Sequence, residues 1–340
     1  MLHDLYLRVC DKLTRCIVHN RFLYSSRVGA YVLLRLPVQR LYLHITTKCN
    51  MRCVHCQYLV QNERHFKDVE MTDLGAIRQR IKNSKIRYCT VSAEGEPLLN
   101  SHLKEILRVL HDEHVETIFV TNGLLLDSFL DVLHQMVAKV VVSLDAPNAA
   151  VYQGIRNAPP EIFEKVCENI RLFAEKRRTI GMGKGTRLGI KFDLHKGLLS
   201  SVDAMIARAR DLSADEILFG TINDEKKGGF DLLMKGDQEV ESQLSFLRQK
   251  YSDQNIVWPK LIDMEIKGFC SMLFSGKVVN SDFALSPCCH IAGNSDVYGV
   301  GDKPTVAMRA FKKRFLSSKD VSEMDYHCQH CQRRIVDGGR

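Results

Sequence analysis

The 340-residue chain lacks an uninterrupted apolar run long enough to cross a membrane. It also lacks the apolar stretch of a secretory leader, because charged residues such as Asp4, Arg8 and Arg15 interrupt its first segment. Hydrophobic residues make up 45% and charged residues 26% of the sequence, which is typical of a globular protein with its own core. We therefore expect a cytoplasmic protein with one barrel-sized domain and an appendage.

A concentrated basic surface is missing as well. Forty-eight basic residues accompany 40 acidic ones, and the net charge of +8 is spread along the chain. Aromatic residues account for only 8%, and no stripe of them alternates with basic residues as in surfaces that bind nucleic acids. The sequence thus disfavours a nucleic-acid partner and favours a solvated basic surface over an anionic substrate or a membrane surface.

Cysteine, in contrast, is abundant, with 12 residues. Cys49, Cys53 and Cys56 are spaced C-x3-C-x2-C, directly after an apolar run at 41–45 that predicts a strand. Three thiolates at this spacing can hold three corners of a 4Fe-4S cluster and leave one iron open to a small molecule. A zinc site usually takes four ligands in pairs, so zinc and scattered core cysteines are the weaker interpretations.

With this triplet after its first strand, the chain resembles the radical S-adenosylmethionine (SAM) superfamily. The resemblance implies that SAM chelates the open iron through its amino and carboxylate groups. It further implies that one electron, delivered by a reductant such as flavodoxin or ferredoxin, cleaves SAM to a 5′-deoxyadenosyl radical. Relatives usually carry an aromatic residue near the adenine just before the third cysteine, and His55 occupies this position.

Short β-branched runs alternate with helical patterns from residue 41 to about 221, which predicts a parallel α/β fold. The predicted strands are 41–46, 86–92, 115–120, 139–144, 187–193 and 216–220. The predicted helices are one capped by Thr72 and those at 101–113, 127–136, 160–178 and 200–211. Six strands agree with the partial (β/α)6 TIM-like barrel that the resemblance implies, with its chemistry at the carboxyl ends of the strands.

The string SAEGEPLLN follows the second predicted strand. It matches the Gly-Glu-Pro segment of the superfamily, and the resemblance assigns SAM binding to Gly95, Glu96 and Pro97. A carboxylate stabilises the methionine ammonium group, and a glycine allows close approach of the backbone. Glu94 stands where many relatives have a second glycine.

Polar residues also follow the third and fourth predicted strands. The resemblance places Ser143, Asp145 and Arg156 at the ribose or carboxylate of SAM. Alternatively, Asp145 caps the next helix and Arg156 lies on the surface of that helix. Thr121 and Asn122 line the expected face without an assignable role.

Five further cysteines occur near the end of the chain. Four of them could complete a second cluster, and their arrangement resembles the Twitch domain, a shortened SPASM domain. The resemblance implies an auxiliary 4Fe-4S cluster held by Cys270, Cys328, Cys331 and one cysteine of the doublet Cys288–Cys289. We take Cys288, directly after Pro287, as this ligand, with Cys289 left over. Residues 275–277 predict a turn between 272–274 and 278–279. A zinc ribbon is the alternative.

These patterns divide the chain into three parts. Residues 1–40 form a basic extension whose apolar residues recur at helical spacing, and we expect it to cap the barrel, with contact to a membrane surface as the alternative. Residues 41–222 form the barrel core. Residues 223–340 form linker helices and the Twitch/SPASM-like domain.

Two reactions fit this organisation. The substrate radical can be oxidised by electron transfer to the auxiliary cluster, or it can be quenched by a thiol such as Cys289 to give an epimer. We favour oxidation (dehydrogenation) of a carbohydrate-like or peptide-derived substrate, to which residues such as Asp193 and His195 contribute polar contacts. A radical SAM enzyme acting on RNA and a zinc-stapled nucleic-acid-binding protein are the remaining hypotheses.

Overall fold

The computed structural model describes Leu13, residues 39–56, Tyr58 and residues 67–180, 185–222, 229–262, 276–279 and 285–286. Within these ranges, nine strands form one sheet in the order β7-β6-β5-β4-β3-β2-β1-β8-β9. Their bounds are β1 Arg40–His44, β2 Tyr88–Ser92, β3 Glu116–Thr121, β4 Lys139–Ser143, β5 Arg187–Leu194, β6 Glu216–Thr221, β7 Ile256–Val257, β8 Gly276–Val279 and β9 Leu285–Ser286.

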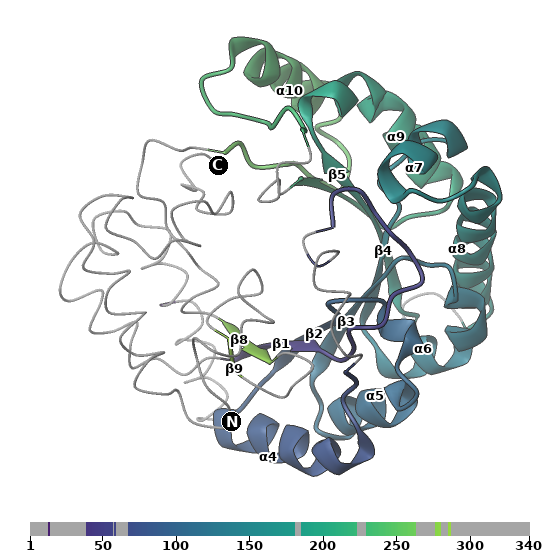
Figure 1. The fold of residues 1–340 in the computed structure, drawn as a ribbon, viewed down its shortest axis with the longest axis vertical. Coiled ribbons are helices and arrows are strands. Elements are labelled where there is room, and N and C mark those ends of the chain that lie inside the picture. Colours follow the sequence, from purple (N-terminus) through teal and green to yellow (C-terminus); the bar gives the residue numbers. More distant parts are fainter. Residues whose placement is uncertain are drawn as a thin grey trace.

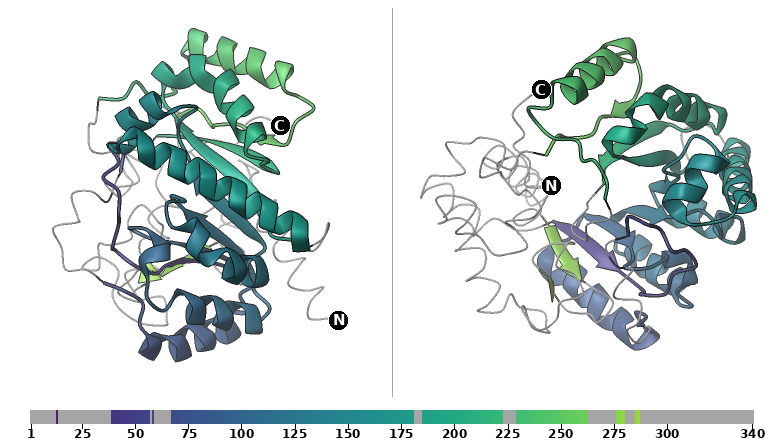
Figure 2. Two further views of the ribbon diagram at one scale, coloured as in Figure 1. Left: turned by 90° about the vertical axis from the view of Figure 1, so that its right-hand side faces the viewer. Right: turned by 45° about the horizontal axis from the view of Figure 1, so that its top comes forward.

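The sheet is curved and open, and helices cover its convex side (Figure 1). All neighbouring strands run parallel except β8 and β9, which are antiparallel. Figure 2 shows the same helical layer from two further directions. The chain therefore has the predicted α/β architecture of a partial TIM-like barrel.

The helices follow the predicted rhythm. They are α4 Leu74–Ser84, α5 Leu103–Asp112, α6 Leu130–Met136, α7 Ala149–Arg156, α8 Pro160–Ile180, α9 Val202–Asp211 and α10 Gln238–Lys250. Short 3-10 turns lie at Met71–Asp73, Pro97–Leu99, Leu126–Phe129 and Lys196–Ser201. All six predicted strands are confirmed, with ends that agree within two residues.

Two local predictions were wrong. Thr72 does not cap α4, because it lies inside a 3-10 turn that begins with a capping box between Glu70 and Asp73. The predicted turn at 275–277 is also wrong, since Gly276 and Lys277 belong to β8 and pair with β1. Val278 and Val279 are fully buried there, so the apolar pair extends the core across an edge of β1 that would otherwise be open.

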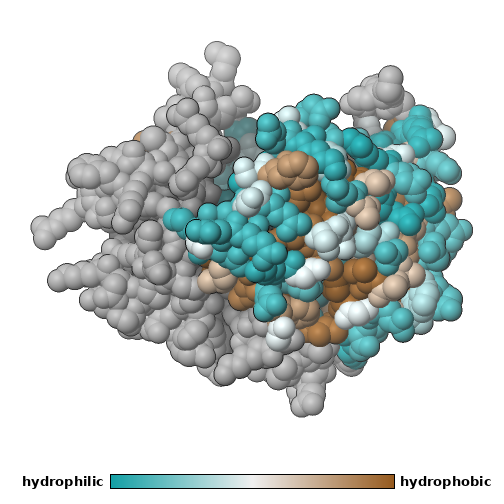
Figure 3. Space-filling view, turned by 90° about the horizontal axis from the view of Figure 1, so that it is seen from above, coloured by the Kyte–Doolittle hydropathy of each residue, from teal (hydrophilic) through white to brown (hydrophobic). Residues whose placement is uncertain are grey.

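The core lies between the sheet and the helices. Val140, Val141 and Val142 of β4 are all buried, as expected for a parallel strand covered on both faces. No helix within the described ranges has the length and apolarity needed to span a membrane. Seen from above, hydrophilic residues cover much of the described surface, with apolar residues between them (Figure 3). The predicted N-terminal helix lies outside the described residues, apart from Leu13.

Candidate functional site: a cavity at the carboxyl ends of the strands

A cavity of about 290 Å³ lies at the carboxyl ends of the parallel strands. Its walls come from the loops after β1 and β2 and from the ends of β3, β4, β5 and β6. The predicted site residues that line it are Cys49, Cys53, His55, Cys56, Gly95, Glu96, Pro97, Ser143 and Arg156. The structure thus brings together the residues that the sequence had assigned to separate loops, at the end of the barrel where such folds carry their chemistry.

The three cysteines of the triplet all face this cavity, and none of them forms a disulfide. Cys53 is buried, and Cys49 and Cys56 are half-buried. Burial raises the pKa of Cys49 to about 11. A bare thiol there is protonated at neutral pH, and iron is the kind of cation that would stabilise the thiolate. Three thiols in one cavity, none of them in a disulfide, fit the ligand set of an iron–sulfur cluster.

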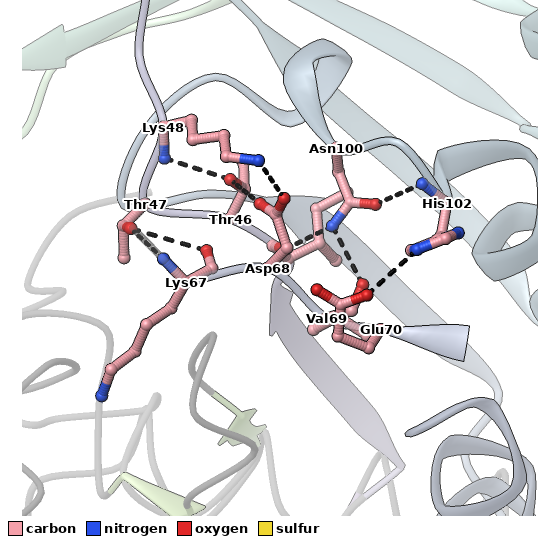
Figure 4. A network of polar contacts seen from close by, with 10 residues as sticks. Thr46, Thr47, Lys48, Lys67, Asp68, Val69, Glu70, Asn100 and His102 are labelled. Carbon is pink, nitrogen blue, oxygen red and sulfur yellow. Dashed lines mark hydrogen bonds and ion pairs between the residues drawn. The ribbon is translucent and has the colours of Figure 1, made fainter. Parts of the chain in front are cut away.

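A polar network closes the base of the cysteine loop, which we define as residues 46–56 (Figure 4). The Asp68 carboxylate accepts hydrogen bonds from the Thr46 hydroxyl and, at 2.5 Å, from Nζ of Lys48. Nδ2 of Asn100 donates to the carbonyl oxygens of Ile45 (2.6 Å) and Val69 (3.2 Å). These hydrogen bonds hold Asp68, Val69 and Asn100 against residues 45–48, the segment between β1 and Cys49.

Gly95 touches this loop from the other side. A Cβ atom at Gly95 would lie 1.9 Å from the carbonyl oxygen of Lys48. The amide of Glu96 donates to that same oxygen at 2.6 Å. The sequence predicted a close backbone approach at this glycine, and the approach seen here is to the cysteine loop. Only glycine fits at this contact.

The Glu96 carboxylate links the loop after β2 to the end of β3 and the residue that follows it. It accepts hydrogen bonds from the Thr121 hydroxyl (2.6 Å), the Asn122 amide (2.7 Å) and the Leu98 amide (3.1 Å). Burial raises the pKa of Glu96, and these three hydrogen bonds oppose that rise. Nδ2 of Asn122 in turn donates to Oδ1 of Asn50 at 2.7 Å. Thr121 and Asn122, to which the sequence gave no role, therefore position Glu96 and the cysteine loop.

Asp145 and Arg156 form a buried ion pair, with Nη2 of Arg156 2.6 Å from Oδ2 of Asp145. The reading of Asp145 as a helix cap and Arg156 as a surface residue is wrong. Asn148 caps α7 instead, through a hydrogen bond from the Val151 amide. Asp145 has a left-handed backbone with φ of 59°. Arg156 also donates to the backbone carbonyl of Ser143, so these three predicted residues lie together.

His55 lies against the same ion pair. Its Nε2 atom is 3.6 Å from Oδ2 of Asp145, and only 14% of its side chain is exposed. Burial lowers the pKa of His55, while the nearby Asp145 carboxylate opposes that shift. A neutral imidazole therefore occupies the position that the resemblance assigns to the adenine contact.

The sequence analysis missed a second buried pair in this region. His44 and Glu94 face each other, with Nδ1 3.6 Å from Oε1, and their side chains are only 4% and 7% exposed. Glu94 also lines the cavity. The signal in the sequence was the glutamate in place of a second glycine, but nothing in the sequence linked it to His44.

Of the two residues predicted to contact the substrate, Asp193 and His195, only one lies in the cavity wall. Asp193 lines the cavity together with Lys191, its ion-pair partner. His195 does not line it; its Nδ1 accepts a hydrogen bond from the Gly197 amide at 3.2 Å and caps a 3-10 turn. The auxiliary-cluster candidates Cys270, Cys288, Cys328 and Cys331, and the spare Cys289, lie outside the described residues.

Comparison with known proteins agrees with this geometry. Residues 43–191 match the family described as the radical SAM superfamily. Together with the fold and the cysteine loop, this match identifies residues 43–191 as a radical SAM domain. The match runs from β1 into β5 and includes the three cysteines and Gly95–Pro97, and it does not reach β6 or the C-terminal cysteines.

Curated relatives share only part of their length with the chain. A probable GTP 3′,8-cyclase of Methanococcus maripaludis is 36% identical over 115 residues, which cover 33% of this chain and 38% of that protein. The GTP 3′,8-cyclase of Staphylococcus saprophyticus is 34% identical over 134 residues, covering 36% of this chain and 38% of the relative. The aligned part therefore spans less than half of these relatives.

Solved structures share the fold over a longer stretch. SuiB of Streptococcus suis bound to S-adenosylmethionine has a TM-score of 0.63 at 13% identity, over 89% of this chain and 71% of SuiB. The protein anSMEcpe with bound AdoMet has a TM-score of 0.64 at 16% identity, over 89% of this chain and 88% of that one. At these identities the likeness establishes the fold alone.

Proposed function

We propose that Cys49, Cys53 and Cys56 hold a 4Fe-4S cluster and that the chain uses SAM to generate a 5′-deoxyadenosyl radical. The observation that carries this proposal is that the three cysteine thiols and the Gly95–Pro97 segment line one cavity. When bound, the cluster supplies the electron that cleaves SAM. The protein's part is to place SAM and substrate and to exclude water.

The cavity walls suggest where SAM lies. The backbone around Gly95, Glu96 and Pro97 receives the methionine end, beside the cysteine loop that it contacts through Lys48. Ser143 and the Asp145–Arg156 pair contact the ribose or the carboxylate, and His55 contacts the adenine. This arrangement is supported by the shared cavity of Gly95, Ser143, His55 and Arg156.

For the C-terminal part we propose a Twitch/SPASM-like domain within residues 223–340 that holds one auxiliary 4Fe-4S cluster through Cys270, Cys288, Cys328 and Cys331. The antiparallel pair β8–β9 lies between the first two of these cysteines in the sequence. It also pairs with β1, the strand that leads into the cysteine loop. A domain attached there would stand next to the cavity and could accept an electron from a substrate radical.

We further propose that the reaction is oxidation of a peptide-derived or carbohydrate-like substrate, with a reductant such as flavodoxin or ferredoxin supplying electrons. Two structural neighbours, SuiB with precursor peptide SuiA and anSMEcpe with Kp18Cys peptide, were solved with bound peptides. Epimerisation with Cys289 as the hydrogen donor remains the second reaction type. We also propose that the basic N-terminal extension, residues 1–40, caps the barrel and that the protein is cytoplasmic.

A nucleotide substrate is the competing hypothesis, because the curated relatives named above are GTP 3′,8-cyclases. Lysine and arginine side chains are common partners of phosphate groups. Among the described residues that line the cavity, the lysine and arginine side chains are Lys191 and Arg156, and both are paired with carboxylates. The described walls thus favour a substrate without a triphosphate.

Anaerobic reconstitution tests the proposal. We expect a brown protein with about eight irons, reflecting two four-iron clusters, that forms 5′-deoxyadenosine from SAM under dithionite. Replacing Cys49, Cys53 and Cys56 by alanine abolishes this product. A colourless protein containing zinc, or an undiminished yield from the triple variant, would overturn the assignment. Peptide and GTP are then compared as substrates, and oxidation gives a product two hydrogen masses lighter than the substrate.

A further inference from the structure

Three side chains meet in a buried row beside the cavity. Oδ2 of Asp145 lies 2.6 Å from Nη2 of Arg156, and Nη1 of Arg156 donates a hydrogen bond to Sγ of Cys53 at 3.2 Å. The three residues are 1%, 6% and 9% exposed, respectively. A permanent positive charge is therefore in direct contact with one of the three sulfur atoms that the proposed function assigns to iron.

The neighbouring structure holds this row in place. The Val54 amide donates to the carbonyl of Ile155 at 2.9 Å, and the Tyr152 hydroxyl lies 3.8 Å from Sδ of Met51. Helix α7, which carries Arg156, is thus fastened to the cysteine loop at two further points. Oδ1 of Asp145 accepts a hydrogen bond from the amide of Asp193 at 2.7 Å.

The charge on Arg156 is secure. Burial by itself would lower its pKa, but the Asp145 carboxylate and the Cys53 thiol outweigh burial and raise that pKa above its ordinary value. Other charged or titratable groups in this region include His55, Glu96, Tyr152, the His44–Glu94 pair and the Lys191–Asp193 pair. They are unchanged in all variants of the redox test below.

From this geometry we propose that Arg156 raises the reduction potential of the cluster bound through Cys53, and that Asp145 limits the rise by neutralising part of the arginine charge. This inference rests on the proposed cluster ligation. Reduction adds one negative charge to the cluster, and a nearby cation stabilises the more negative state. Hydrogen bonds to ligand sulfur atoms and local charge are known determinants of cluster potential. The two residues would therefore act in opposite directions.

The test is a redox titration of the reconstituted full-length protein without SAM, in which electron paramagnetic resonance monitors the reduced cluster. Omitting SAM separates this effect from any contact between Arg156 and SAM. We expect Arg156→Gln to lower the midpoint potential and Asp145→Asn to raise it. Arg156→Lys keeps the charge and stays near the wild type, and the double variant Arg156→Gln with Asp145→Asn titrates between the two single variants.

A matched control is the exposed pair of Arg171 and Asp211, whose Nη2 and Oδ2 atoms are 3.0 Å apart on the outer helices. Arg171→Gln and Asp211→Asn should leave the potential unchanged. Two single variants that both leave it unchanged, or shift it in the same direction, overturn the inference. If Arg156→Gln does not fold, Asp145→Asn must still titrate above the double variant. Iron analysis distinguishes failure of this inference from failure of the proposed function, because a wild-type protein that binds no iron refutes cluster ligation by the cysteine triplet.

Discussion

The loops after β2 and β4 each hold a buried carboxylate, Glu96 in the cavity wall and Asp145 beside the wall residue Arg156, yet their surroundings differ. Glu96 is held by a hydroxyl and two backbone amides, all of them neutral. Asp145 is held by a guanidinium and one backbone amide. Neutral donors leave the pKa of Glu96 raised by burial. The Glu96 carboxylate thus links neighbouring segments through neutral groups, whereas the Asp145 carboxylate balances the charge of Arg156, which contacts the cysteine loop.

The largest expected effect concerns the glycine beside Glu96. Gly95→Ala would place Cβ 1.9 Å from a backbone oxygen, and backbone atoms cannot move aside as a flexible side chain can. We expect a loss of about 4 kcal/mol or more in the free energy of unfolding, together with failure to bind iron. Chemical denaturation and iron analysis measure both. Gly75→Ala serves as control, since no atom lies within 4 Å of its added Cβ.

The second prediction tests the charged carboxylate. Asp145→Asn should destabilise the iron-free protein by about 3–5 kcal/mol, because it leaves the Arg156 charge buried without its partner. Asparagine tolerates the left-handed backbone at this position, so strain does not contribute. Urea unfolding of the reduced, metal-free protein gives the value. A loss below about 1 kcal/mol in the free energy of unfolding would show that Asp145 does not neutralise a buried Arg156 charge.

The third prediction tests the carboxylate held by neutral groups. Glu96→Gln keeps the shape of the side chain, but an amide NH2 group replaces one carboxylate oxygen and faces the donors of Asn122 or Thr121. We expect a loss of about 1–3 kcal/mol in the free energy of unfolding. In the proposed function it also weakens SAM binding while iron content is retained. Calorimetry with SAM and iron analysis test this. Equal affinity for SAM in both proteins would limit Glu96 to a structural role.

The same variant has a pH signature. Burial raises the pKa of folded Glu96 above its ordinary value of 4.5, so the folded state binds a proton more readily than the unfolded state. The wild type therefore gains stability relative to Glu96→Gln as pH falls through the folded pKa toward 4.5. Parallel unfolding curves at several pH values measure the difference. A constant difference would show that Glu96 does not titrate in this window.

The sequence predicted which segments line the cavity but not which side chains pair across it. Strand positions followed from β-branched runs such as that of β4, and the cysteine loop from its spacing. The partners came from distant segments: Arg156 lies 103 residues from Cys53, and Thr121 lies 25 residues from Glu96. Such pairs depend on how strands are ordered in the sheet. The turn at 275–277 failed for the same reason, since β1 determined the structure of that segment.

The smallest effect separates the two interpretations of the loop after β4. Asn148, not Asp145, accepts the capping hydrogen bond of α7, from the Val151 amide at 3.0 Å. Asn148→Ala should therefore cost only about 1 kcal/mol, the usual value of a helix cap, and leave the cluster potential unchanged. Asp145→Asn changes both quantities, although it lies only three residues earlier. Unfolding and redox titrations of the two variants side by side provide the test. A shift of the potential in Asn148→Ala would show that movement of α7, rather than the charge of the Asp145–Arg156 pair, sets the potential.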